Sequence, residues 1–199
     1  LPIDRLVVAT NANDILARTL ATGRYETREV VATSSPSMDI QVSSNFERLL
    51  FEAAGRDVEA VKRWMGGLRQ SGAFTIDAAP LAAIRAEFAA GRAGEAETAA
   101  AIRDVLAQSG YLLDPHTATA VHVARELPAG RAPMVVLATA HPAKFPAAVA
   151  AAAGVTPALP PRLGDLMERA ERFTVLPSRL EIVEDHVRAR TRAGSVQGE

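Results

Sequence analysis

The sequence has 199 residues, 48% of them hydrophobic, and its 22 basic and 23 acidic side chains give a formal net charge of −1. This size and apolar content allow one large domain or two small ones with a sizeable core. A nearly neutral chain offers no basic field, which excludes nucleic acid and anionic membrane surfaces as partners. The absence of cysteine excludes disulfides, thiolate nucleophiles and sulfur-ligated zinc, and it is compatible with a cytoplasmic protein.

The beginning of the chain is unusual for a complete protein. LPIDRLVV contains neither an initiator methionine nor the cationic head of a signal peptide, and it enters a strand-like run at once. We therefore expect the sequence to start within a fold. No stretch approaches the roughly 18 consecutive apolar residues of a membrane span, so we also expect a soluble protein.

The first predicted elements are a strand and a helix. Residues 6–9 form an apolar run typical of a strand, and Asn13 is placed to cap a helix that Gly23 ends. A short extended piece is expected at Val30 and Val31, before the turn-prone SSPSMD.

Two further helices are predicted after this turn. Ser44 and Glu47 have the spacing of a capping box, which predicts a helix to Gly55. Asp57 caps the next helix, but the glycine pair at 66–67 costs roughly 1 kcal/mol per residue relative to alanine. The second half of that helix is therefore expected to be weak.

Residues 78–90 and 94–109 both predict helices, and the second has apolar residues at i, i+3 and i+4 with Gly110 after it. Asp114–Pro115 combines an N-cap with a proline at the first helical position, which predicts another helix through Val123.

Residues 134–138, MVVLA, form a continuous apolar run between Pro133 and Thr139. Such a run is typical of a strand buried on both faces of a parallel sheet. A helix from Pro142 through Ala153 is expected after it.

Strands that alternate with helices predict an α/β fold with a mostly parallel sheet and flanking helices. We assign residues 1–154 to this fold and residues 155–199 to a proline-rich connector and a helical C-terminal tail. In such folds ligands collect at the carboxyl ends of strands, so the expected rim carries Thr10, Asn11, Thr139, Ala140 and His141.

The spacing of the histidines and the absence of known motifs argue against several kinds of site. His116 and His122 are six apart, which is neither the i+3 nor the i+4 spacing of two ligands on one helix face, so no metal site is expected. The sequence lacks the G-x-S-x-G, G-x-G-x-x-G and G-x-x-x-x-G-K-[ST] motifs, and with them the usual signatures of serine hydrolases and nucleotide enzymes.

Two polar segments leave alternatives open. DPHTATAV can be explained by helix capping from Asp114 and Thr117, but the free N–H groups of the same helix start could also bind an anion. SPSMDIQVSSN fits turn and capping duties, and it also fits a loop that closes over a polar ligand.

Four stretches taken together have a specific order and separation: VVATNANDIL (7–16), SPSMDIQVSSNFERLLFE (35–52), GYLLDPHTA (110–118) and TAHPAKF (139–145). They closely resemble the C-terminal part of bacterial and fungal-type threonine synthases. The resemblance covers the chain from Leu1 to about Ala150, and the last 45 or so residues add little to it.

The resemblance implies a pyridoxal-phosphate enzyme of the tryptophan-synthase-like fold (fold type II). In the family, O-phosphohomoserine and water become threonine and phosphate. The family's Schiff-base lysine and its glycine-rich phosphate-binding turn lie upstream of Leu1, so no catalytic residue is assigned to this chain. We expect the chain to be inactive alone and to need the missing N-terminal part of the same protein.

One cofactor-binding residue carries over from the family. Its threonine that hydrogen-bonds the pyridine nitrogen begins the T-A-H-P-A-K-F stretch, which corresponds to Thr139. Lys144 is the lysine of this stretch rather than the Schiff-base lysine, and it either binds the substrate phosphate or forms a surface ion pair. The resemblance and the rim position also make substrate-binding candidates of His141, Asp39, Ser37 and His116, and place Asn11, Asn13 and Ser35 nearby.

Two other functions remain open. A threonine-synthase-like phospho-lyase would release 2-ketobutyrate from the same substrate. A non-catalytic module would keep the fold and bind a phosphorylated amino acid or a protein partner.

Overall fold

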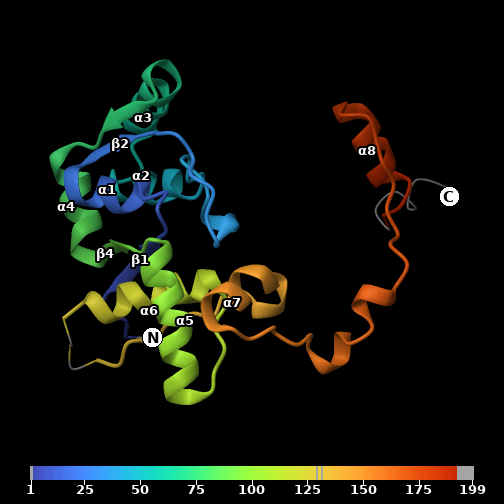
Figure 1. Cartoon of the computed structure of the whole chain (residues 1–199). Helices are drawn as coiled ribbons and strands as arrows, with labels where there is room; N and C mark the ends of the chain where they lie inside the picture. The colour runs from blue at the N-terminus through green and yellow to red at the C-terminus, as the bar shows by residue number, and fades with distance from the viewer. Residues whose placement is uncertain (1, 129, 131, 192–199) are drawn as a thin grey trace. The chain divides into compact units, whose positions relative to one another are not determined.

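The structure is a computed structural model that describes residues 2–128, 130 and 132–191. It divides into two compact units, Leu1–Leu159 and Pro160–Glu199 (Figure 1). Among the described residues, no helix has both the length and the apolar character needed to cross a bilayer. The predicted division at residue 154 differs from this by five residues, and the assignment of the two parts to a fold and a tail stays a prediction.

The first unit contains all four strands and seven of the α-helices that are described. In chain order these elements are β1 (Leu6–Thr10), α1 (Ile15–Thr22), β2 (Arg24–Glu26), α2 (Phe46–Ala53), α3 (Val58–Ser71), β3 (Ala73–Thr75), α4 (Ala78–Glu87), β4 (Phe88–Arg92), α5 (Glu95–Ser109), α6 (Pro115–Glu126) and α7 (Pro146–Ala153). Two single 3₁₀ turns, Pro36–Met38 and Pro142–Lys144, lie in the connecting segments.

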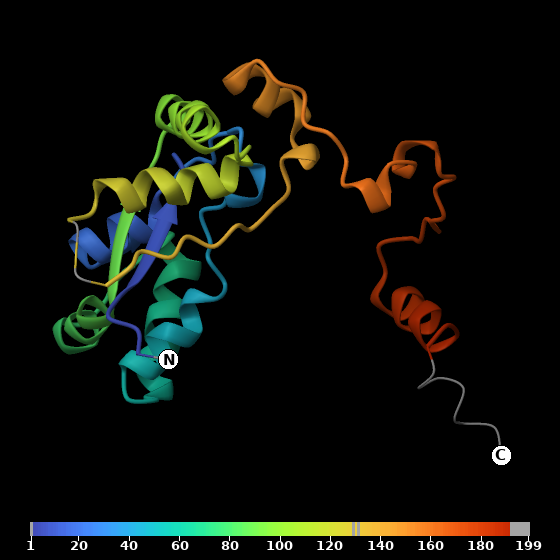
Figure 2. The same ribbon diagram turned by 90° about the horizontal axis from the view of Figure 1, so that it is seen from below.

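The strands form two separate pairs. β1 runs parallel to β4, in register from Leu6 opposite Phe88 to Thr10 opposite Arg92, and β2 runs antiparallel to β3. Helices α1 and α6 pack on opposite faces of the β1–β4 pair (Figures 1 and 2). The α/β class is therefore confirmed.

The prediction of one helix over residues 78–90 is wrong at its end. Helix α4 stops at Glu87, and Phe88–Arg92 continues as β4. Alanine and glycine dominate this strand and give a weak strand signal. Close packing explains why residue 91 is a glycine, because a Cβ there would lie 2.7 Å from a methyl group of Val123 on α6.

Helix α3 is longer than its sequence suggests. Asp57 caps it as predicted, accepting hydrogen bonds from the N–H groups of Glu59 and Ala60, but the helix continues through both glycines to Ser71. A Cβ on Gly67 would lie 3.1 Å from the carbonyl oxygen of Ala73. The glycine thus allows β3 to pack closely against the helix, and this packing offsets its low helix propensity.

Two predicted caps are not formed. Ser44 does not cap α2, because the N-cap position is taken by Asn45, which makes no side-chain cap bond, and the N–H of Phe46 donates to the Ser43 carbonyl. Asn13 does not cap α1, because its side chain instead bonds the backbone of Val31. For Asn13, hydrogen bonds to a distant part of the chain replace the predicted cap bond.

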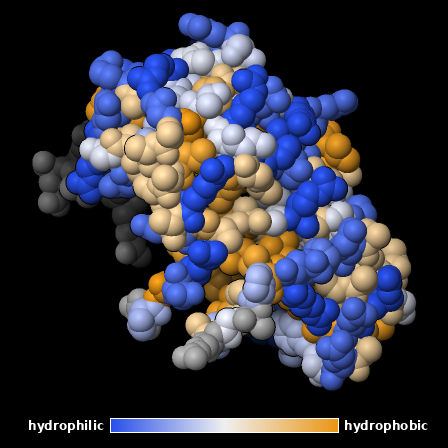
Figure 3. Space-filling view, turned by 90° about the vertical axis from the view of Figure 1, so that its left-hand side faces the viewer, coloured by the Kyte–Doolittle hydropathy of each residue, from blue (hydrophilic) through white to orange (hydrophobic). Residues whose placement is uncertain are grey.

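The prediction of a buried strand at residues 134–138 is wrong in this structure. The segment has no strand assignment, and Val135 and Leu137 are 76% and 73% exposed. Its apolar pattern favours burial, but a strand needs a neighbour, and the part of the chain that the structure describes places none beside it. Exposed apolar surface also gathers between charged side chains on the face shown in Figure 3, and such surface often marks an interaction site.

The helix predicted from Pro142 through Ala153 is divided. A 3₁₀ turn over Pro142–Lys144 is followed by α7, which begins at Pro146. Proline at this position has no N–H to donate to a preceding turn and starts a helix more readily than it continues one.

The second unit contains two short 3₁₀ turns, Pro161–Leu163 and Leu166–Glu168, and helix α8 (Leu180–Arg188). The unit contains less helix than was predicted for the C-terminal tail. Residues 169–179, between the turn Leu166–Glu168 and α8, adopt no helix.

Aromatic rings form the centre of the main core. Tyr25 stacks on Phe46 and Phe74 with ring centroids 5.5 and 4.9 Å apart, and Trp64 stacks on Phe74 at 6.3 Å. These rings join β2, β3, α2 and α3. The polar end of Tyr25 is also used, since its Oη accepts a 2.8 Å hydrogen bond from the N–H of Ser43.

Tyr25 makes the stability of the core sensitive to alkaline pH. Burial raises the pKa of its hydroxyl above the ordinary 10.0, and the Ser43 N–H opposes this only in part. Above that ordinary pKa the unfolded chain releases a proton that the folded chain retains, so the free energy of unfolding falls as pH rises. Below it the contribution is complete.

The variant Tyr25→Phe should lose about 1 kcal/mol of stability near neutral pH, because the Ser43 N–H loses its acceptor. It should also lose less further stability than the wild type as the pH rises above about 10. Urea denaturation followed by the fluorescence of Trp64 measures both effects. Equal alkaline losses in the two proteins would assign the effect to other groups.

Candidate functional site

Three segments far apart in the sequence meet at the first turn of α6. They are the turn around Ser37, the helix start Asp114–Thr117, and residues 139–145. The chain turns back after α6 and runs along it toward this start (Figure 2). All three segments carry residues that the sequence singled out, and hydrogen bonds link Ser37 and Thr139 to the start of α6.

Asp114 lies at the centre of this cluster with only 2% of its surface exposed. Its Oδ1 accepts hydrogen bonds from the N–H groups of His116, at 2.9 Å, and Thr117, at 3.4 Å, as the predicted N-cap should. Its Oδ2 accepts a short hydrogen bond from the Thr117 hydroxyl. The Nδ1 atom of His116 lies 3.1 Å from Oδ1.

The imidazole of His116 connects the cap to the serine-rich loop. Its Nε2 accepts a 3.2 Å hydrogen bond from the N–H of Ser37. An N–H donor at Nε2 requires a lone pair there, so the neutral ring carries its proton on Nδ1 and donates it to Asp114. The ring also packs against Phe145, with centroids 4.6 Å apart.

Thr139 is held by its backbone. Its N–H donates a 3.2 Å hydrogen bond to the hydroxyl oxygen of Thr117. Its side chain lies on an exposed residue, and its hydroxyl has no hydrogen-bond partner among the described residues. The hydroxyl is thus available to a ligand.

Asp39 belongs to a second polar network. Its Oδ1 accepts hydrogen bonds from the side-chain amides of Asn11, at 2.7 Å, and Asn13, at 2.9 Å, and from the Thr33 hydroxyl at 2.7 Å. Its Oδ2 accepts the N–H of Thr33 at 2.8 Å. The buried Ser35 joins this network through its hydroxyl, which lies 3.0 Å from the Asn11 amide nitrogen. The network fixes the serine-rich loop beside the end of β1.

His141 and Lys144 lie on the exposed side of the cluster. The Nδ1 of His141 accepts a 3.2 Å hydrogen bond from the N–H of Ala143 and so caps the 3₁₀ turn. The Lys144 ammonium lies 5.8 Å from the ring centroid of Phe145. No carboxylate within ion-pair distance of Lys144 is found in residues 2–128, 130 and 132–191.

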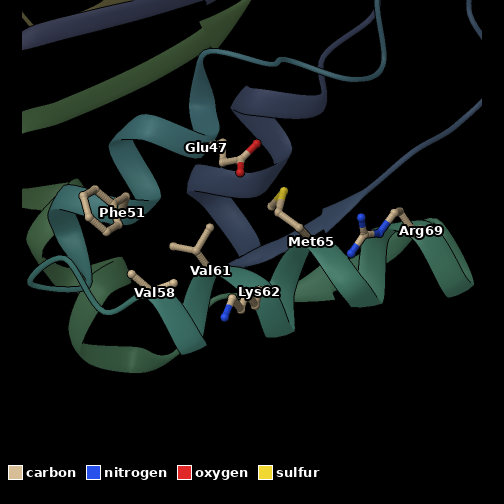
Figure 4. Close-up of a pocket in the computed structure, with 7 residues that line it drawn as sticks. All are labelled: Glu47, Phe51, Val58, Val61, Lys62, Met65 and Arg69. Atoms are coloured by element: carbon tan, nitrogen blue, oxygen red, sulfur yellow. The ribbon is translucent and has the colours of Figure 1, made fainter.

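Two hollows of the structure lie away from this cluster. One, of about 310 Å³, lies between α2 and α3 and is lined by Glu47, Phe51, Val58, Val61, Lys62, Met65 and Arg69 (Figure 4). The other, of about 270 Å³, lies between α5 and α7, with Ser34 and Glu95 at its edge. Asp114, His116, Thr117 and Thr139 line neither of them.

Sequence patterns did not distinguish the residues that hold this rim. For Asp114 and Thr117 the sequence offered helix capping or anion binding at the helix start, and neither alternative predicted the bond between their side chains. Phe145 is apolar, and nothing in the sequence predicted its contact with His116. Similarly, nothing in the neighbours of Thr33 marks it as a bonding partner of Asp39.

Comparison of the sequence with known proteins identifies a family that contains these segments. The model of the C-terminal region of threonine synthase matches residues 117–187. The threonine synthase of Pseudomonas aeruginosa is 46% identical over 189 residues, which cover 94% of this chain and 40% of that protein. The chain thus spans about 40% of the length of the curated relative it matches.

Solved structures agree with the sequence relatives. The crystal structure of pyridoxal-phosphate-bound threonine synthase from Brucella melitensis has a TM-score of 0.88 and 64% identity, covering 96% of this chain and 41% of that one. Yeast threonine synthase has a TM-score of 0.80 and 33% identity, covering 94% and 42%. The chain is thus a portion of the tryptophan-synthase-like fold, fold type II of the pyridoxal-phosphate enzymes. Within this class it belongs to the threonine synthase family and corresponds to its C-terminal portion.

Proposed function

We propose that this chain forms the C-terminal part of a cytoplasmic threonine synthase that uses pyridoxal phosphate to convert O-phosphohomoserine and water into threonine and phosphate. The observation that carries the proposal is Thr139, whose backbone is fixed by Thr117 while its hydroxyl stays free. This hydroxyl begins the segment that the family uses to contact the cofactor ring.

The residues present fit one side of the cofactor. A hydroxyl can donate a hydrogen bond to a neutral pyridine nitrogen, whereas a carboxylate would hold that nitrogen protonated. Both carboxylate oxygens of Asp39 and of Asp114 already accept other donors, whereas the hydroxyl of Thr139 has no partner among the described residues. When bound, the cofactor supplies an electron sink for the substrate carbons.

The exposed residues after Thr139 suit a phosphorylated substrate. The Lys144 ammonium has no carboxylate partner in the described part of the chain and can act as a compact point charge on a phosphate. His141 presents its Nε2 on the same exposed turn, because its Nδ1 accepts the Ala143 N–H. We assign both side chains to substrate phosphate, and Ser37, which is exposed, to a neighbouring polar contact.

Asp39 and His116 take other roles in this proposal. Asp39 is saturated by its own network, and the His116 ring uses both nitrogens within the protein. Neither has a free atom to offer a substrate. They hold the loop and the helix start in place.

The chain lacks a lysine suited to covalent attachment of the cofactor. Lys62 lies on the exposed side of α3 and pairs with Glu59 at 2.8 Å, and Lys144 is exposed. A nucleophilic lysine is normally activated by desolvation or by a neighbouring cation. We infer that the chain alone is inactive and that the remaining length found in its relatives supplies the lysine and the phosphate-binding turn.

Incubation of the purified chain with pyridoxal phosphate, followed by borohydride reduction and mass spectrometry, should give no stoichiometric adduct, and a parallel unreduced incubation with O-phosphohomoserine should give no threonine. Lys62→Arg and Lys144→Arg, tested separately, control for slow modification of exposed amines. An adduct on one lysine that forms together with threonine would contradict the proposed inactivity.

The complete protein that carries this chain tests the reaction itself. Supplied with O-phosphohomoserine, it should release threonine and phosphate in equal amounts. Release of 2-ketobutyrate in place of threonine would instead establish the phospho-lyase alternative, and binding of the substrate without turnover would favour a non-catalytic module.

A further inference from the structure

The carboxylate of Asp114 does more than a helix cap requires. Capping accounts for the two backbone N–H groups that it accepts, those of His116 and Thr117. Asp57 caps α3 with the same two kinds of bond and nothing more. Asp114 additionally holds the Thr117 hydroxyl and the His116 ring, and each of these side chains reaches a different segment of the candidate site.

The first branch runs through Thr117 to Thr139. The Thr117 hydroxyl can donate only one proton, and Asp114 receives it. Its oxygen lone pair then points away from the carboxylate and accepts the N–H of Thr139. Asp114 thereby sets the direction in which Thr117 can accept, and with it the position of the Thr139 backbone.

The second branch runs through His116 to Ser37. Asp114 receives the proton of Nδ1, which leaves Nε2 as an acceptor for the N–H of Ser37. If the ring adopted the other tautomer, an N–H on Nε2 would face the N–H of Ser37. At metal sites, a carboxylate that accepts the other ring N–H of a ligating histidine commonly fixes its tautomer in this way, and here the partner is a backbone N–H.

The two branches also hold both ends of one segment. Residue 139 is tied to α6 through Thr117, and residue 145 packs its ring on His116 at 4.6 Å. His141 and Lys144 lie between these two attachments. Their places relative to α6 therefore depend on the same buried carboxylate.

We propose that Asp114 is the positioning residue of this site, which places Thr139 through the Thr117 hydroxyl and Ser37 through the His116 ring. The value of this positioning for turnover rests on the proposed function above. The hydrogen-bond relay itself is a property of the chain and can be tested without cofactor or substrate.

Amide hydrogen exchange in the full chain separates the two branches. Ser37 lies in an exposed 3₁₀ turn and Thr139 in an exposed irregular segment, and their amides are held by these side-chain acceptors, so they depend on them for protection. Thr117→Val keeps the shape of the side chain but removes its hydroxyl, and exchange at Thr139 should accelerate on the order of tenfold. Exchange at Ser37 should stay unchanged, and Thr117→Ser should restore the wild-type rate at Thr139.

His116→Phe provides the reciprocal test and serves if Thr117→Val fails to fold. It keeps a ring against Phe145 but removes both nitrogens, so exchange should accelerate at Ser37 and stay unchanged at Thr139. The proposal is overturned if Thr117→Val leaves Thr139 unchanged, if Thr117→Ser behaves like Thr117→Val, or if either variant accelerates both amides equally.

The same Thr117 variants in the complete protein link the relay to function. Thr117→Val should lower kcat/KM for O-phosphohomoserine, and Thr117→Ser should recover it. Normal exchange patterns in a protein that turns over no O-phosphohomoserine would refute the proposed function and leave the relay intact. Altered exchange with unchanged kcat/KM would overturn the positioning role.

Discussion

Replacing Asp114 by alanine should lower the free energy of unfolding by about 3 kcal/mol. Loss of the helix cap contributes about 1 kcal/mol. The Thr117 hydroxyl and the His116 ring N–H lose their acceptor in a buried place, which costs about 1–3 kcal/mol more. Urea denaturation followed by Trp64 fluorescence measures the change, since Trp64 is the only tryptophan of the chain.

Asp57→Ala is the matched control for this prediction. Asp57 accepts the same two backbone N–H groups at the start of α3, at 2.9 and 3.2 Å, but it is exposed and holds no side chain. Its replacement should cost about 1 kcal/mol or less. Asp114→Asn should fall between the two, because an asparagine still caps the helix but accepts through one oxygen only. If Asp114→Ala costs no more than Asp57→Ala, the bonds to Thr117 and His116 add nothing to stability.

Local signals predicted the helices well because their causes are local. Asp57 and the Asp114–Pro115 pair start helices through bonds to N–H groups two or three residues away. Gly23 and Gly110 end α1 and α5 with φ values of 79° and 72°, a conformation that costs glycine little. Each of these decisions involves only a few neighbouring residues.

Elements that depend on distant partners were less predictable. β4 is a strand because it pairs with β1, more than 80 residues earlier in the register, and its composition alone does not reveal this. Residues 134–138 show the opposite error. Their composition predicts a strand, but strand formation also needs a neighbouring strand, and the described chain offers none at this place.

The candidate site followed the same rule. The strand-end argument and the family resemblance identified Ser37, His116 and Thr139, and the structure brings them around one carboxylate. The sequence could not show that Asp39 is consumed by two asparagines and Thr33, because those bonds span up to 28 residues. The sequence also could not show whether Asp114 only caps the helix or additionally bonds the side chains of His116 and Thr117, because the same local motif fits both roles.

Replacing Thr139 by valine in the complete protein should lower kcat/KM for O-phosphohomoserine by about 10- to 100-fold. Loss of the proposed hydrogen bond to the cofactor ring nitrogen would cost about 1–3 kcal/mol in a site shielded by the rest of the enzyme. Valine keeps the branched shape, and the backbone N–H that bonds Thr117 remains. Threonine synthesis measured with purified variants gives the ratio.

Thr139→Ser keeps the hydroxyl and should stay within a few-fold of the wild type. Because Thr139 is exposed in the described chain, Thr139→Val should change the stability of the chain by less than about 0.5 kcal/mol. A loss of activity without a loss of stability would therefore report on the ligand contact, whereas full activity of Thr139→Val would remove this residue from the cofactor site. Since the relay from Asp114 acts on the backbone of Thr139 and valine removes only its hydroxyl, amide exchange at residue 139 should stay slow in Thr139→Val even as activity falls.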